Sequence, residues 1–141
     1  MDGHQDSSKS KVRSPGPPAQ TTIVNITSLE ALQLMDDHDG VGPILFRRVF
    51  DESDVPEINF VDFTEVPPGS AIGTHSHNNT VEIYFIVSGN PLVTVDERVF
   101  RLHPSGISVV LAGSSHSLIN DTQNNVQMLV IEVNSHEIWK R

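Results

Sequence analysis

The sequence predicts an all-β, single-domain protein, because its apolar residues fall in many short runs with turn-forming residues between them. β-Branched and aromatic residues dominate these runs, and the runs recur at the spacing of antiparallel β proteins. A chain of 141 residues suits one domain with one core. From strand chemistry alone, a jelly roll, a lipocalin-like barrel and an immunoglobulin-like sandwich all remain open.

The chain begins with a predicted flexible N-terminal arm over residues 1–20, MDGHQDSSKSKVRSPGPPAQ. This segment is rich in serine, proline, glycine and charge, so it buries too little apolar surface to offset the entropy of ordering it. It lacks the apolar central region of a secretory signal. The barrel domain is expected over residues 21–141, with Trp139 docked on the barrel or on a partner subunit.

A short strand-like segment (21–26) and a short helix (27–35) are expected to open the barrel domain. Thr27 and Glu30 have the spacing of a helix capping box, which predicts the helix. The strands expected after it cover residues 43–50, 59–66, 70–77, 82–89, 91–102, 107–112, 116–120 and 126–133. Glycine, proline, asparagine and serine clusters separate them.

Composition narrows the function classes. The net charge is −9, and no basic cluster occurs outside the arm, which argues against nucleic acid and against an anionic membrane surface. There are no cysteines, so disulfides and thiol chemistry are excluded. The cytoplasm is the simplest compartment for such a chain.

Two histidines one residue apart stand out among the seven in the chain. His75 and His77 share one face of a strand, because strand side chains alternate. A turn at 77–80 can then bring Glu82 back beside them, and His116 opens a later strand. Three imidazoles and a carboxylate suit one divalent transition metal: iron, manganese, nickel, cobalt, copper or zinc. Four protein ligands around an octahedral ion leave two positions open.

These residues resemble the first motif of the cupins, glycine-x5-His-x-His-x(3,4)-Glu-x6-glycine. Here the motif reads Gly69, His75, His77, Glu82 and Gly89, with every fixed position matched. The later half of the second cupin motif is matched by Gly113, His116 and Asn120, whereas Leu111 and Ser105 depart from its proline and first glycine. Asn120 and the motif glycines are expected to serve the backbone near turns.

The resemblance to cupins implies a jelly-roll β-barrel and a metal held by His75, His77, Glu82 and His116. It also implies frequent homodimers. Iron(II) is favoured among the possible metals. The remaining histidines, at 4, 38, 103 and 136, are expected on the surface.

Two further residues are predicted to contact a substrate. Tyr84 lies two positions beyond Glu82 on the same strand face, so its phenol is a candidate catalytic group; the alternative is that it packs in the barrel. Arg48 is expected to point inward and to anchor a carboxylate of a small-molecule substrate. The alternative for Arg48 is an ion pair with Asp51, Glu52 or Asp62.

The sequence leaves three functions open. The first is a metal-dependent enzyme acting on an oxygen-rich or carboxylate-bearing small molecule, with an oxygenase ranked ahead of a lyase or an isomerase. The second is a non-catalytic module that binds or senses a small molecule. The third is a metal-independent barrel that isomerises or epimerises a sugar, with histidines as acid and base. Fold alone does not choose among them.

Overall fold

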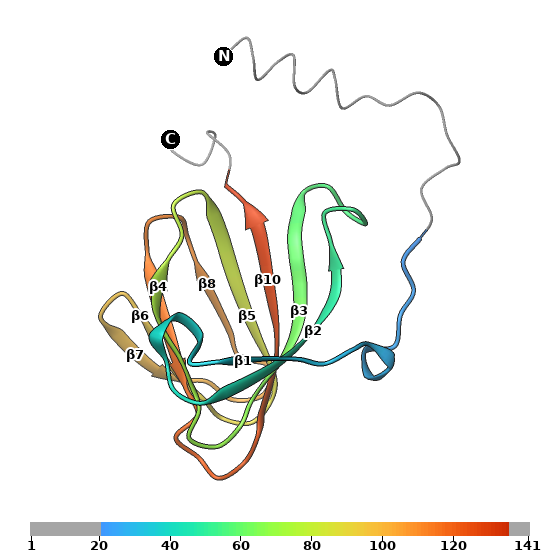
Figure 1. The fold of residues 1–141 in the computed structure, drawn as a ribbon. Helices are drawn as coiled ribbons and strands as arrows, with labels where there is room; N and C mark the ends of the chain where they lie inside the picture. The colour runs from blue at the N-terminus through green and yellow to red at the C-terminus, as the bar shows by residue number, and fades with distance from the viewer. Residues whose placement is uncertain (1–20, 136–141) are drawn as a thin grey trace.

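A computed structural model describes residues 21–135, and the predicted arm (1–20) and Trp139 lie outside this range. Two antiparallel sheets face each other in a sandwich (Figure 1). The larger sheet has the order β1 (Leu32–Met35), β2 (Pro43–Asp51), β3 (Ile58–Val66), β10 (Val126–Asn134), β5 (Thr80–Ser88) and β8 (Ile107–Val110). The smaller sheet has the order β4 (Ala71–Ser76), β9 (Ser115–Ile119), β6 (Leu92–Val95) and β7 (Arg98–Arg101). This is the predicted jelly-roll arrangement.

The hydrophobic core fills the space between the two sheets. Its buried members come from both sheets and are Ile44, Val66, Ile72, Tyr84, Ile86, Val93, Leu118, Val126, Met128 and Val130. They alternate with outward residues along each strand, as strand geometry requires. Ile44, Ile72, Tyr84 and Val130 also line a cavity, so one end of the core is the wall of that cavity.

The predicted helix over residues 27–35 is wrong. Its first residues form only a 3-10 turn, η1 (Ile26–Ser28), and its last residues form the edge strand β1. Leu32 pairs with Phe46, and Leu34 pairs with Ile44. The capping signal depends only on neighbouring residues. Pairing of β1 with β2 instead provides hydrogen-bond partners for the backbone at the free edge of β2, and it places Leu34 at the cavity.

Two smaller expectations also change. Residues 21–25 form no strand. The run at 91–102 folds back on itself as the hairpin β6–β7, with the turn at Asp96, whose φ is 54°. Aspartate tolerates this left-handed backbone better than most residues, which explains why the run breaks there. Within residues 21–135, no helix is long and apolar enough to cross a membrane.

Candidate metal centre

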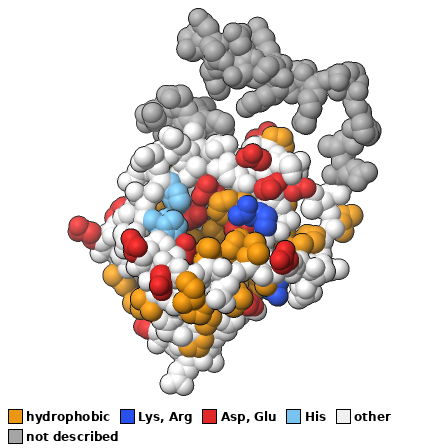
Figure 2. Space-filling view, in the orientation of Figure 1, with side chains coloured by type: hydrophobic (Ala, Val, Ile, Leu, Met, Phe, Trp, Pro, Cys, Tyr) orange, Lys and Arg blue, Asp and Glu red, His pale blue; other side chains and the backbone are white. Residues whose placement is uncertain are grey.

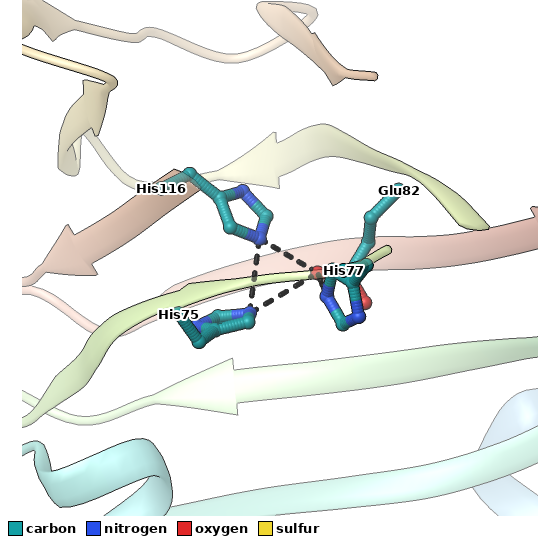
Figure 3. Close-up of side chains that lie close together, drawn as sticks. All are labelled: His75, His77, Glu82 and His116. Atoms are coloured by element: carbon teal, nitrogen blue, oxygen red, sulfur yellow. Dashed lines mark hydrogen bonds and ion pairs between the residues drawn. The ribbon is translucent and has the colours of Figure 1, made fainter. Parts of the chain in front are cut away.

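Three strands bring His75, His77, Glu82 and His116 together (Figure 3). His75 lies on β4 directly opposite His116 on β9. His77 follows β4 in the turn, and Glu82 lies on the next strand, β5. The His77 carbonyl accepts a hydrogen bond from the Gly113 amide at 2.8 Å, so the backbones of the two predicted motifs are tied together.

The four side chains present their ligand atoms to a common point, with all four atoms within 4.8 Å of one another. Glu82 Oε1 lies 2.8 Å from His116 Nε2, 3.4 Å from His77 Nε2 and 3.5 Å from His75 Nε2. His75 Nε2 and His116 Nε2 are 3.0 Å apart. The sequence prediction of these four residues as one cluster is therefore confirmed.

A hydrogen bond orients the ring of His75, and a carboxylate approaches the ring of His77. His75 Nδ1 lies 2.8 Å from the Gly73 carbonyl oxygen, which accepts its hydrogen bond and leaves Nε2 to face the cluster. His77 Nδ1 lies 3.9 Å from a carboxylate oxygen of Glu132. A histidine that binds a metal commonly donates its other ring nitrogen to an acceptor of this kind.

The electrostatics favour a deprotonated carboxylate. Burial raises the pKa of Glu82, but hydrogen bonds from His116 and His75 outweigh burial and hold that pKa well below the usual carboxyl range. Burial lowers the pKa of His75, whereas Glu82 and the Gly73 carbonyl raise it, with a net increase. An ionised Glu82 is the form that a cation requires.

The donor set fits a divalent transition metal. His77 Nε2 is buried beside Glu82 and has no hydrogen-bond partner among the described residues. A buried polar nitrogen without a partner is destabilising, and a cation at the common point would satisfy it. Three imidazole nitrogens and one carboxylate oxygen are ligands for iron, manganese, nickel, cobalt, copper or zinc, so the four residues could bind any of these metals.

A cavity of about 180 Å³ opens beside the cluster. Figure 2 shows histidine and basic side chains on opposite sides of a hollow whose floor is hydrophobic. The lining residues are Leu34, Asp37, His38, Ile44, Phe46, Arg48, Phe60, Asp62, Thr64, Ile72, His75, Glu82, Tyr84 and Val130. Two of the four clustered residues, His75 and Glu82, therefore face the cavity, where a bound molecule can reach them.

Arg48 lines this cavity with Ile44 and Phe46, which lie on the same face of β2. Its Nη2 lies 3.3 Å from Asp62 Oδ2, and its Nε donates to Asp62 Oδ1. The guanidinium also lies 4.7 Å from the centre of the Phe60 ring. Arg48 thus faces the cavity and also forms one of the ion pairs that the sequence left open.

Tyr84 lines the same cavity and packs against the His/Glu cluster. Its ring stacks on that of His116, with centroids 4.7 Å apart, and only 2% of the residue is exposed. Burial raises the pKa of the Tyr84 phenol well above its usual range. The phenol therefore keeps its proton, which favours hydrogen bonding over a role as a base.

Sequence reasoning missed two side chains near the site, Glu132 and His38, and left Asp62 as one of three possible partners of Arg48. Asp62 is the carboxylate that pairs with Arg48, and Glu132 approaches His77 while it accepts a hydrogen bond from Asn59 at 3.1 Å. His38 is exposed, as expected, but its ring stacks on that of His75. The acidic residues carried a signal, since each interrupts an apolar strand on its inward face. His38 carried no comparable signal.

The structural residues of the two motifs behave as predicted. Asn120 is fully buried, and its side-chain amide donates to the carbonyls of Val66 at 2.8 Å and Asn124 at 2.7 Å. Gly89 has a φ of 89° and lies against the backbone of residue 125, where an added Cβ would be 2.6 Å from the carbonyl oxygen. Ser105, which replaces a motif glycine, keeps a left-handed backbone with a φ of 76°.

The fold and the site together define a small jelly-roll protein with a buried His/Glu cluster at a cavity. The model of the cupin domain family matches residues 62–132, which include all four clustered residues. The chain therefore belongs to the cupin family, and the resemblance seen in its motifs is confirmed.

Known proteins similar to this chain include an oxalate-binding protein of Thermotoga maritima, 27% identical over 67 residues. That match covers 48% of this chain and 55% of the relative, so the chain spans about half the length of this curated relative.

Two solved structures share the fold. A predicted oxalate decarboxylase of Thermotoga maritima is 18% identical, with a TM-score of 0.78 over 79% of this chain and 98% of that one. The Cnp3 cupin domain of Schizosaccharomyces pombe is 19% identical, with a TM-score of 0.66 over 80% of this chain and 74% of that one. At these identities the structures support the fold alone.

Proposed function

We propose that this protein is a metal-dependent enzyme whose substrate is a small molecule bearing a carboxylate or other chelating oxygens. One observation carries the proposal: a buried cluster of three imidazoles and a carboxylate shares a single cavity with an arginine. A metal would be held by His75, His77, Glu82 and His116. When bound, it would supply Lewis acidity at the positions that the four ligands leave open.

The chain's own residues would bind and orient the substrate. The Asp62 contacts use Nε and Nη2 of Arg48, which leaves Nη1 for an acceptor on the substrate. Because Asp62 and Phe60 fix the guanidinium, little side-chain entropy remains to be lost on binding. Tyr84 would donate its phenolic hydrogen to an oxygen near the metal.

The cavity favours a compact substrate. Its volume of about 180 Å³ equals that of roughly six water molecules at about 30 Å³ each, which is room for a small dicarboxylate. Ile44, Ile72 and Val130 form an apolar wall that excludes water from the reacting group. A low local dielectric there strengthens every charge interaction in the site.

Among the reactions, an oxygenase with dioxygen as co-substrate ranks first, because a His/Glu ligand set suits iron(II). The test is oxygen uptake by the iron(II)-loaded protein across a panel of small carboxylates, with manganese-loaded and metal-stripped protein as controls. Uptake that requires iron(II) and a carboxylate supports an oxygenase. Turnover that is undiminished under nitrogen replaces the oxygenase with a lyase or an isomerase.

Non-catalytic binding is the second candidate function, and the similarity to an oxalate-binding protein supports it. In this case the metal would hold oxalate or a related acid without turnover. Isothermal titration of manganese-loaded protein with oxalate, followed by recovery of the ligand, separates the two candidates. Tight binding with quantitative recovery of unchanged acid favours a binding protein. The homodimer, the cytoplasmic location and the absence of nucleic-acid and membrane partners stay predictions.

A further inference from the structure

The ring of His38 lies flat against the ring of His75. The two centroids are 3.8 Å apart, and the planes differ by 9°. The ring planes of two other pairs in the site are less parallel: they differ by 23° for Tyr84 stacked on His116 and by 57° for the tilted pair of His75 and His116. His38 also lines the cavity, together with His75.

The turn that carries His38 is held in an unusual backbone conformation. The short 3-10 turn η2 (Asp37–Asp39) contains His38 with a φ of 52°, and the flanking residues Asp36 and Asp39 have φ values of 53° and 63°. Left-handed backbone at a non-glycine residue is strained and persists only where surrounding contacts enforce it. Asp36 closes the turn, because its amide donates to the Gly42 carbonyl at 3.0 Å and its carboxylate accepts from the Gly42 amide at 2.8 Å.

The same turn is packed against the strand of His75. A Cβ added at Gly73 would lie 2.0 Å from the His38 carbonyl oxygen, and a Cβ added at Gly40 would lie 2.1 Å from the Ala71 carbonyl oxygen. Only glycine permits these approaches. The β4–β9 register shifts between Ile72 and His75, so β4 is irregular at this contact.

His75 is therefore fixed from two directions. Gly73, whose lack of a side chain leaves room for the turn, accepts the Nδ1 hydrogen bond of His75 through its carbonyl. The His38 ring supports the face of the same imidazole. The backbone alone does not explain an imidazole at position 38, since glycine or asparagine adopts a φ of 52° with less strain.

We propose that His38 is a positioning residue for the metal ligand His75, with the stacked ring holding the imidazole so that Nε2 faces the other three ligands. The proposal rests on the proposed metal centre. It assigns to His38 no bond to the metal and no proton transfer. Its role is to restrict rotation of the His75 ring, which outer contacts of metal ligands commonly do.

The experiment compares His38→Asn, which suits the left-handed backbone but removes the ring, with His38→Phe, which keeps an aromatic face. His103→Ala is the matched control, because His103 is exposed, contacts Asn90 and does not line the cavity. Each variant is titrated with cobalt(II), and its ligand-field absorption spectrum is recorded. We expect about three- to tenfold weaker cobalt(II) binding and shifted absorption bands for His38→Asn, as a lost aromatic stack implies.

We expect His38→Phe to stay within about twofold of the wild type, as His103→Ala does. An unchanged affinity and spectrum for His38→Asn would overturn the proposal. An equal loss for His38→Asn and His38→Phe would also overturn it, because it would make the His38 nitrogen itself a ligand. If His38→Phe does not fold, His38→Asn still decides the outcome.

Nuclear magnetic resonance of the metal-free protein separates this proposal from the proposed function. The ring protons of His75 should carry an upfield ring-current shift that His38→Asn removes. If the wild type shows this shift but binds no cobalt(II), the metal centre fails and His38 positions no ligand. If the wild type binds cobalt(II) but shows no such shift, only the role of His38 fails.

Discussion

The two ends of the cavity differ in how far their polar groups satisfy one another. At the ligand end, ring nitrogens crowd around one carboxylate oxygen, and His77 Nε2 has no hydrogen-bond partner among the described residues. At the opposite end, Arg48 is paired side-on with Asp62 and covers Phe60. The ligand end could hold a metal ion, whereas the arginine end already contains an ion pair.

The two ends are therefore expected to contribute differently to the protein. Polar groups that have no partner within the protein contribute mainly to binding, so their substitution lowers the affinity for a ligand. Groups that are already paired contribute to stability as well, so their loss is seen partly in unfolding. Substitutions at the two ends should therefore change different measurements.

The largest effect is expected at the ligand end, for Glu82→Gln. This change keeps the side-chain shape but removes the charge that all three histidines approach. Metal affinity should fall by more than about 100-fold, beyond the loss seen for outer contacts of a metal. Elemental analysis after metal loading measures it, with exposed Glu97→Gln as the control. A variant that keeps wild-type metal content would remove Glu82 from the ligand set.

The next effect is expected at the arginine end, for Arg48→Lys. Lysine keeps the charge beside Asp62 but lacks the planar fork that can serve a carboxylate and a substrate at once. Oxalate should bind the manganese-loaded variant about tenfold more weakly, because about this much affinity is lost with one charge-assisted hydrogen bond. Isothermal titration measures it. Unchanged oxalate affinity together with unchanged metal content would leave Arg48 only as the partner of Asp62.

The sequence predicts contacts between residues that are close along the chain better than contacts between distant residues. Three of the four ligands lie within eight residues on one hairpin, so strand alternation and one turn place them together. His116 required the match to the second motif, because pairing of β4 with β9 joins residues 41 positions apart. No local pattern fixes such a pairing.

The features that were missed or left open all depend on long-range register. The Arg48–Asp62 pair forms because β2 and β3 align those two residues, and the sequence offered two other carboxylates as partners. His38 meets His75 only because a left-handed turn packs on two glycines. The helix at 27–35 failed for the same reason: its capping signal was real but weaker than the pairing of β1 with β2.

A third effect should separate stability from binding at the arginine end. In Asp62→Asn the bidentate ion pair is lost, while the cavity keeps its shape. The Asp62 side chain is only 11% exposed, but that of Arg48 is 44% exposed. Water can therefore solvate the unpaired guanidinium and offset part of the lost stability. The free energy of unfolding should fall by about 1–2 kcal/mol.

Urea unfolding of the metal-free protein measures this loss. Asp121→Asn is the matched control, since it breaks the exposed ion pair with Arg101 and should change stability less. Metal affinity should stay within about twofold for both variants. Equal stability losses for the two aspartates would mean that burial adds nothing to the Arg48–Asp62 pair.

The smallest effect is expected where the two ends meet, for Tyr84→Phe. The ring that stacks on His116 remains, so the metal content should not change. Only the hydroxyl of this cavity-lining residue is removed, and we propose that the protonated phenol donates a hydrogen bond to a bound molecule. Oxalate affinity of the manganese-loaded protein should fall roughly two- to fivefold, as one neutral hydrogen bond implies. Loss of metal from Tyr84→Phe would instead make the hydroxyl part of the support of His116, and unchanged oxalate affinity would reduce Tyr84 to a packing residue of the core.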